Sequence, residues 1–197
     1  MNYAVIDIET TGGSFDTEKI TEVGIVKFNG KKVIGEYHTL INPTKSIPYF
    51  ITKLTGIDNG MVADAPKFFE VAKDIIEFTE DCYFVAHNAR FDYGFIHAEF
   101  KNLGYNYNRK TLCTVKMSRK LIPGHKSYSL GKLCTSLGID LNNHHRALDD
   151  AKATAEILTL LSKQNGFADY VGSPKQKLIS QENITDPLLK KINSFPE

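Results

Sequence analysis

An apolar strand pattern near the N-terminus carries two acidic residues, and this pair constrains the fold more than any other feature. The segment reads YAVIDIETTGG from residue 3 onward, and one isoleucine separates Asp7 from Glu9. Side chains of a strand alternate between its two faces, so both carboxylates point the same way. Two neighbouring carboxylates repel each other, and burying either one without a partner is unfavourable. The fold must therefore bring something positive to this face.

The composition favours a soluble globular protein with one domain and a modest extension. The chain has 197 residues, of which 42% are hydrophobic and 24% charged. No segment approaches the roughly 18 uninterrupted apolar residues of a membrane helix. The sequence enters a strand pattern without a basic and apolar leader, so we expect a cytoplasmic location and no membrane association. Cys82, Cys113 and Cys134 are odd in number and lack paired spacing, which predicts reduced thiols.

Strand patterns dominate the first part of the chain. They cover residues 3–9, 20–28 and 33–41, and the tight turn NGKK between the last two predicts a hairpin. A loop is predicted for residues 54–66. Pro66 then opens a helix with apolar residues at helical spacing. This part of the sequence predicts an antiparallel meander followed by a helix.

Strands and helices alternate in the second part. The apolar run CYFVAHN predicts a buried strand, followed by a helix that ends at Gly104. A short strand near residues 111–114, two basic helices and a long helix from His145 to Gly166 complete the pattern. The order predicts an α/β fold with a mixed sheet flanked by helices. We expect one domain over residues 1–166, with residues 167–197 forming a C-terminal extension, linker or docking tail.

Positive charge is concentrated in one stretch. Residues 100–139 contain no Asp or Glu, and tyrosines are interleaved among the cations. Nucleic-acid affinity arises largely from neutralising backbone phosphates, so such a stretch suits a phosphate polymer. An ordinary solvated face is the alternative. The cations are Lys101, Arg109, Lys110, Lys116, Arg119, Lys120, Lys126 and Lys132.

Two further acids, Asp92 and Asp150, are candidates for the same site as Asp7 and Glu9. Asp92 follows the buried strand and falls slightly inside the next helix, where it is either a helix cap or a ligand. In the last helix, Asp150 continues an apolar stripe through Ile157, the stripe expected to pack on the sheet. Asp149 belongs to the opposite, charged stripe. Asp150 is therefore the candidate site residue.

Two adjacent histidines precede this helix. On a continuous helix His145 would face Asp149, four residues further on. The conflict disappears if His145 lies on the loop that enters the helix. His144 is interpreted as the solvent-facing neighbour of the pair.

The ordered set DIETTG, HNARFD and HRALDD resembles the DEDDh branch of the 3′-to-5′ exonucleases. That family includes the epsilon proofreading subunit of the bacterial replicative DNA polymerase, ribonuclease T and oligoribonuclease. The likeness covers about residues 3–165, and His145 stands five residues before Asp150, as the family pattern requires. The resemblance implies a ribonuclease-H-like mixed sheet.

The resemblance also implies a metal-dependent reaction. Asp7, Glu9, Asp92 and Asp150 would hold two divalent ions, and hard carboxylate oxygens suit Mg²⁺ or Mn²⁺. Metal cations would then offset the repulsion between the first two acids. Two ions about 4 Å apart activate a water and stabilise the leaving 3′ oxygen. His145 would be the general base.

By resemblance, several other residues approach the substrate. Thr10, Thr11 and Gly12 match a family segment whose backbone and hydroxyls approach the terminal nucleotide. Leu54 and, more loosely, Phe91 match positions that pack against the terminal base, with ordinary core packing as the alternative. Asn88 is interpreted either as a phosphate ligand or as a residue that fixes its own loop.

The expected substrate is single-stranded DNA or an unpaired DNA 3′ end, hydrolysed to nucleoside monophosphates in proofreading or repair. The shared catalytic set fits RNA equally well, as in ribonuclease T. A third reading is an interaction module that docks on a polymerase or repair factor through the tail from Tyr170 to Glu197.

Overall fold

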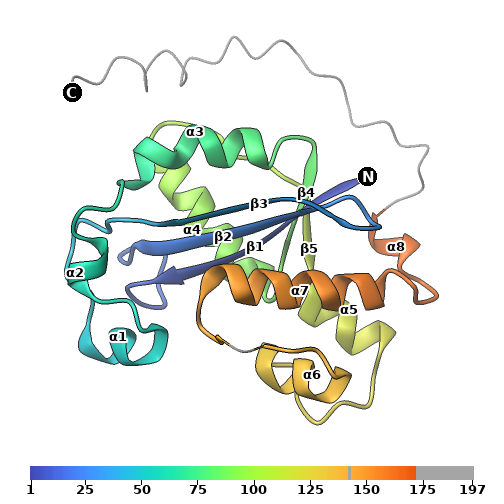
Figure 1. The fold of residues 1–197 in the computed structure, drawn as a ribbon. Helices are drawn as coiled ribbons and strands as arrows, with labels where there is room; N and C mark the ends of the chain where they lie inside the picture. The colour runs from blue at the N-terminus through green and yellow to red at the C-terminus, as the bar shows by residue number, and fades with distance from the viewer. Residues whose placement is uncertain (142, 172–197) are drawn as a thin grey trace.

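The computed structural model describes residues 1–141 and 143–171, which form a five-stranded sheet covered by helices on both faces (Figure 1). The strand order is β3-β2-β1-β4-β5. The first three strands pair antiparallel, whereas β1, β4 and β5 run parallel to one another. The predicted meander and the later alternation of strands and helices are confirmed. The strands are β1 (Asn2–Thr10), β2 (Ile20–Phe28), β3 (Val33–Leu40), β4 (Cys82–Ala86) and β5 (Thr111–Cys113).

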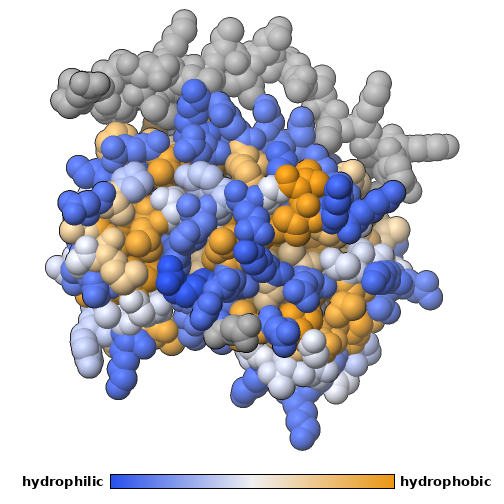
Figure 2. All heavy atoms as spheres, viewed as in Figure 1, coloured by the Kyte–Doolittle hydropathy of each residue, from blue (hydrophilic) through white to orange (hydrophobic). Residues whose placement is uncertain are grey.

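Two hydrophobic clusters lie on opposite faces of this sheet. Helices α3 (Phe68–Phe78) and α4 (Ala89–Asn102) build the first cluster. Helices α5 (Thr114–Leu121), α6 (Leu130–Leu137) and α7 (Ala147–Leu161) build the second. In Figure 1, α7 begins at the end of the sheet where β1 ends. Hydrophilic side chains gather between β3 and α7 in the same view (Figure 2).

Strand β1 alternates strictly between the two clusters. Ala4, Ile6 and Ile8 belong to the cluster under α3 and α4. Tyr3 and Val5 belong to the cluster under α7. Because the period of a strand is two residues, the next odd-numbered side chains continue toward α7. The two acids of the strand therefore face the first turn of that helix.

One short helix lies within the segment that the sequence predicts as a loop, and another ends at the start of that segment. Helix α1 spans Tyr49–Thr55 and α2 spans Asn59–Val62. The loop prediction for residues 54–66 is wrong here, because helices of four and seven residues are too short to show helical periodicity. Local signals do mark them. Gly56 ends α1 in the left-handed conformation with φ 74°, and Asp58 caps α2 by accepting from the Met61 N–H.

The packed part of the chain continues past the last long helix. Helix α8 (Ala168–Val171) contacts the second cluster, and the Tyr83 hydroxyl donates to the Val171 carbonyl at 2.8 Å. The division at residues 166 and 167 stays a prediction, and the predicted tail helix lies outside the described residues. Among the described helices, none has the length and apolar character needed to cross a membrane.

Gly24 lets α7 lie directly on strand β2. A Cβ built at this position would lie 2.4 Å from the Ala147 carbonyl carbon and from the Leu148 nitrogen. Both are backbone atoms of the first turn of α7, so no side chain can rotate away. The close approach of helix to sheet therefore depends on this glycine.

We expect Gly24→Ala to destabilise the fold by about 1–3 kcal/mol, the usual range for overpacking. Denaturant unfolding measures the change. Gly13→Ala is the matched control, because a Cβ at Gly13 meets nothing within 4 Å and its φ is not positive. Equal stability of Gly24→Ala and Gly13→Ala would contradict the close approach.

Candidate active site

Three carboxylates converge where β1 ends and α7 begins. Oxygens of Asp7, Glu9 and Asp150 all lie within 4.8 Å of one another. Strand alternation supplies the first two, and the first turn of α7 supplies the third. Asp150 is buried at 4% exposure, and the stripe it shares with Ile157 packs against the sheet as predicted. The structure thus brings together three of the four acids expected at the site.

Asp92 lies beside this group without joining the 4.8 Å cluster. It stands in the first turn of α4 and is 3% exposed. The N–H groups of Ile8 and of Asp92 itself are hydrogen-bonded to its carboxylate. Its charge is, after burial, the largest influence on the pKa of Asp7. The charge of Asp92 therefore acts on the other acids, although its oxygens lie outside their cluster.

Burial raises the pKa of every acid in the site, and repulsion from neighbouring acids adds to it for Asp7, Glu9 and Asp92. Burial, followed by the charge of Asp150, raises the pKa of Glu9 to about 8. Burial also raises the pKa of Asp92 to about 8. The pKa of Asp7 is raised well above its ordinary value by burial and by the other three acids. Burial raises the pKa of Asp150 as well, although the two histidines oppose it.

The donor set fits divalent metal ions. The groups that meet are carboxylates, the hard oxygen ligands that Mg²⁺ and Mn²⁺ prefer. Arg146 is a nearby cation that lowers the pKa of Glu9, but its guanidinium binds Glu22. Bound cations would offset the repulsion that raises these pKa values.

Both histidines contact Asp150. His145 lies on the loop before α7 with a positive φ of 69°, so the helix begins two residues later than the sequence predicts and the spacing conflict with Asp149 disappears. Its N–H donates to the Asp150 Oδ2 at 3.2 Å. His144 places Nδ1 at 3.1 Å from the same oxygen, and the two rings stack with centroids 4.0 Å apart. His144 is therefore more than the solvent-facing neighbour expected from the sequence.

The ring of His145 is neutral near pH 7. Burial and the adjacent His144 lower its pKa, and Asp150 opposes them. A neutral imidazole can accept a proton, which a general base must do. Its role as the base stays a prediction.

The turn after β1 is held by its own threonines. Thr10 Oγ1 donates to the Gly12 carbonyl at 2.7 Å, and Thr11 Oγ1 donates to Glu18 Oε2 at 2.5 Å. Thr10 and Thr11 are buried at 6% and 1% exposure. Their hydroxyls therefore shape the loop. As substrate contacts, Thr10, Thr11 and Gly12 stay predictions.

The remaining predicted contacts differ in their surroundings. Leu54 is 53% exposed on α1, so the alternative of core packing is wrong for this residue. Phe91 is half-buried, with its ring centroid 5.0 Å from that of Phe95, which fits packing against the core. Asn88 is exposed, has φ 86° and makes no capping hydrogen bond to α4. It remains available for a ligand.

The basic stretch divides into structural and surface cations. Arg109 donates to the Thr79 carbonyl at 3.1 Å and lies over the fully buried Tyr107 ring, so it stabilises the fold. Lys116, Arg119 and Lys120 are exposed on α5. The exposed lysines outside α5 are Lys101, Lys110, Lys126 and Lys132, so a phosphate polymer can reach most of the stretch.

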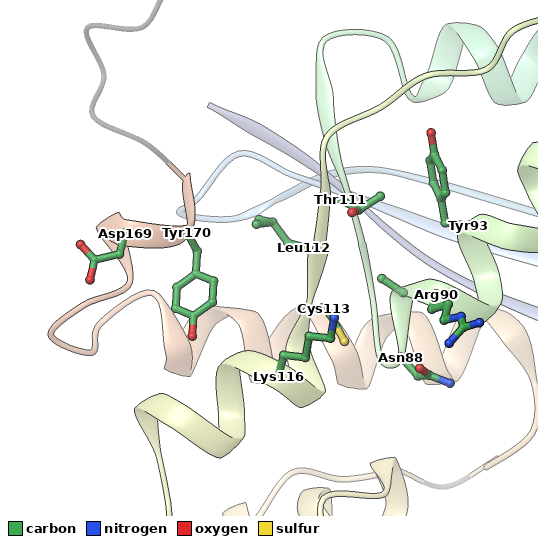
Figure 3. A pocket seen from close by; sticks show the side chains of 10 residues that line it. Asn88, Arg90, Tyr93, Thr111, Leu112, Cys113, Lys116, Asp169 and Tyr170 are labelled. Carbon is green, nitrogen blue, oxygen red and sulfur yellow. The ribbon is translucent and has the colours of Figure 1, made fainter.

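A hollow of about 420 Å³ lies around the short strand β5. Figure 3 shows Tyr170 of α8 on one side of it and Tyr93 of α4 on the other. Arg90 and Lys116 place two cations at its wall. The hollow includes none of the site acids, and it shares only Asn88 with the predicted substrate contacts.

Glu22, an acid near the start of the largely apolar strand β2, was not expected at the site from the sequence. It stands directly opposite Glu9 in the β1–β2 register. A charged residue within an apolar strand pattern is the signal that would have found it, by the same reasoning that found Asp7.

A mixed sheet that ends in a cluster of carboxylates beside a histidine fits a nuclease that hydrolyses phosphodiester bonds. Residues 4–158 match the exonuclease family model RNase_T. The chain therefore belongs to the RNase_T exonuclease family, and its resemblance to DEDDh exonucleases and the ribonuclease-H-like fold are confirmed.

Two curated relatives contain a similar segment. The PolC-type DNA polymerase III of Caldanaerobacter subterraneus subsp. tengcongensis is 46% identical over 155 residues, which cover 79% of this chain and 11% of that protein. The 3′-5′ exonuclease DinG of Staphylococcus saprophyticus is 42% identical over 159 residues, covering 80% of this chain and 18% of that protein. The chain thus spans less than a fifth of either relative.

A solved structure of exonuclease X in complex with 5′ overhanging duplex DNA has a similar fold. It superposes with a TM-score of 0.64 at 27% identity, covering 86% of this chain and 99% of that one.

The raised pKa values predict how stability depends on pH. Unfolded carboxyls titrate near pH 4, whereas Glu9 and Asp92 titrate at about 8 in the fold. Between these values the folded state holds more protons, so the free energy of unfolding without metal should fall as pH rises from 4 to 8. Mg²⁺ binds the deprotonated acids, so its stabilisation should grow over the same range.

Thermal unfolding with Mg²⁺ or with chelator measures both effects. Asp7→Asn should weaken both the pH dependence and the stabilisation by Mg²⁺. Glu36→Gln removes an exposed carboxylate in the middle of β3. It is the control and should preserve both the pH dependence and the stabilisation by Mg²⁺. A metal-free Asp7→Asn protein that is less stable than wild type at pH 8 would show that Asp7 is a structural residue.

Proposed function

We propose that this chain is a metal-dependent 3′-to-5′ exonuclease acting on single-stranded or unpaired DNA ends. The observation that carries the proposal is the convergence of Asp7, Glu9 and Asp150 within 4.8 Å, with His145 beside them. Family membership supports the reaction class. DNA is favoured over RNA because a relative with 46% identity is named as a DNA polymerase.

The residues divide the reaction between them. His145 accepts the proton of a water that attacks the terminal phosphorus, and the bond to the 3′ oxygen of the preceding nucleotide breaks. Divalent ions held by the site acids, with Mg²⁺ or Mn²⁺ as the proposed metals, supply positive charge that offsets the negative charge of the reacting phosphate. The products are a nucleoside monophosphate and a chain shorter by one nucleotide.

Exposed apolar side chains of α1 support binding of a single-stranded end. Tyr49, Phe50 and Leu54 are 80%, 67% and 53% exposed, and the last two lie four residues apart on one side of the helix. Base stacking on apolar and aromatic side chains is typical of single-strand binding. Arg90 and Lys116 offer charges to the phosphates further along the strand.

The biological setting is proposed more broadly. Similarity to PolC-type polymerase and to DinG fits proofreading or repair in the cytoplasm, in association with a polymerase or repair partner. The proposed docking tail beyond Val171 lies outside the described residues.

A substrate panel tests the proposal. End-labelled single-stranded DNA, double-stranded DNA and RNA are incubated with Mg²⁺, Mn²⁺ or chelator. We expect single-stranded DNA to shorten from its 3′ end, releasing monophosphates only when metal is present. Faster cleavage of RNA than of DNA would show that the protein is an exoribonuclease instead. Binding without cleavage in any metal would favour an interaction module.

His145→Ala should lower the cleavage rate by roughly 10²–10⁴-fold, the usual contribution of a positioned base. All site acids remain, so Mg²⁺ and DNA binding should persist. The rate of the wild-type protein should rise with pH through the pKa of His145, which lies below its ordinary value. This rise of the rate with pH should be absent in His145→Ala. Single-turnover rates measured across pH test it.

His144→Ala is the matched variant, one position away and in contact with the same acid. We expect a much smaller loss of cleavage rate and an unchanged rise of the rate with pH. If His144→Ala instead loses the rise of the rate with pH and His145→Ala keeps it, His144 is the general base.

A further inference from the structure

Glu22 is a fully buried acid next to the site. Its exposure is 0%, and it stands opposite Glu9 in the antiparallel pairing of β1 and β2. Directly paired residues of two strands have their side chains on the same face, so Glu22 points toward α7 as Glu9 does. A buried carboxylate in this position must be stabilised by partners.

Its partners come from the start of α7 and from β3. Arg146 Nη2 donates to Oε1 at 2.7 Å, and Nε lies 3.1 Å from the same oxygen and 3.3 Å from Oε2. The Ala147 N–H donates to Oε2 at 2.9 Å. His38 Nε2 lies 2.7 Å from Oε1. Each carboxylate oxygen thus has at least two partners.

These contacts separate Glu22 from the metal-binding acids. It is absent from the described carboxylate groups that lie within metal-ligand range. Burial alone would raise its pKa, but the hydrogen bonds from Arg146, Ala147 and His38 leave the pKa lowered. Glu22 is therefore ionised and engaged by protein groups, whereas the pKa values of the site acids are raised.

The residues that Glu22 holds, Arg146 and Ala147, lie between His145 on the loop and Asp150 in the first turn of α7. Arg146 follows His145 directly, and its carbonyl accepts the Asp150 N–H at 3.0 Å. The His145 N–H in turn bonds the Asp150 carboxylate. Gly24, two residues along β2, lets this turn of α7 approach the strand backbone. A shift at Arg146 or Ala147 would move His145 and Asp150 together.

We propose that Glu22 is a positioning residue that fixes the start of α7 through Arg146 and the Ala147 N–H, and so sets His145 and Asp150 against the acids of β1. The inference rests on the proposed exonuclease function. Glu22 lies outside the described metal-ligand groups, so it positions the reacting groups through these neighbours. Its charge also raises the pKa of Asp7 and Glu9, and Arg146→Lys leaves that charge in place. Small displacements of catalytic groups strongly reduce reaction rates, so such an anchor has a kinetic effect.

Two variants weaken the anchor in different ways. Glu22→Gln keeps the shape and removes the charge, whereas Arg146→Lys keeps the charge and removes the two-nitrogen fork. On end-labelled single-stranded DNA with Mg²⁺, we expect kcat to fall by about 10- to 100-fold and KM to change by less than about twofold. The double variant should lose little more than the worse single variant, because both act through one contact.

Amide hydrogen exchange without metal gives a readout that is independent of activity. The amides of His145 and Asp150 should exchange faster in both variants, while those of β4 should be unchanged. If Glu22→Gln does not fold, Arg146→Lys carries the test alone, because the Arg146 side chain is 38% exposed and tolerates substitution better.

The ion pair between Lys152 and Glu36 provides a matched control. It also joins α7 to β3, at 2.9 Å, but further from the start of the helix. Glu36→Gln and Lys152→Met should therefore leave kcat within about twofold and the exchange of His145 and Asp150 unchanged.

The outcomes separate the inference from the function on which it rests. An active wild type with unchanged kcat in both anchor variants would overturn the positioning role. A loss of kcat that disappears at a temperature where the variants are fully folded would also overturn it, because stability alone would explain it. A folded but inactive wild type would contradict the proposed function, and hydrogen exchange would still test the anchor.

Discussion

Repulsion among carboxylates, two of them buried and two half-buried, is the constraint on which the site depends. Acids from β1, α4 and α7 meet at one end of the sheet, and each raises the pKa of its neighbours. The β-sheet and helices around this cluster are held by their own hydrophobic packing. Ala4, Ile6 and Ile25, for example, are fully buried around β1 and β2. The hydrophobic clusters therefore stabilise a site that opposes folding by itself.

The arrangement of charges shows two ways of burying an acid. Glu22 receives hydrogen bonds from an arginine, a backbone N–H and a histidine, and its pKa is lowered. Asp7, by contrast, faces other acids, and its pKa is raised. The same residue chemistry thus stabilises the fold on β2 and prepares for a cation on β1. Their proximity links the architecture of α7 to the chemistry at its first turn.

Much of this organisation could be predicted because it follows from local periodicity. Alternation along β1 places Asp7 and Glu9 on one face, and the apolar stripe through Ile157 selects Asp150 over Asp149. Features that arise only from tertiary contacts could not be predicted in this way. The stacking of His144 on His145 and its contact with Asp150 depend on how the loop enters α7. The helix α1 was missed because seven residues carry little periodic signal, although Gly56 marks its end.

The surroundings of Asp92 illustrate the same distinction. Its place inside the first turn of α4 follows from the sequence, whereas its hydrogen bond from the Ile8 N–H requires α4 to meet β1. The Asp92 carboxylate lies close enough to Asp7 to raise its pKa but outside the 4.8 Å cluster. Sequence patterns thus identified the residues of the site, and packing decided the distances between them.

The site takes its acids from both ends of the domain, since Asp7 lies in the first strand and Asp150 in the last long helix. Chains are synthesised from the N-terminus, and domains generally fold as units. A growing chain that ends before α7 has β1 and α4 but lacks both Asp150 and His145. Ribosomal synthesis therefore keeps the incomplete chain from assembling the full set of acids near cellular nucleic acid. The last long helix of the domain and the last acid of the site are therefore synthesised together.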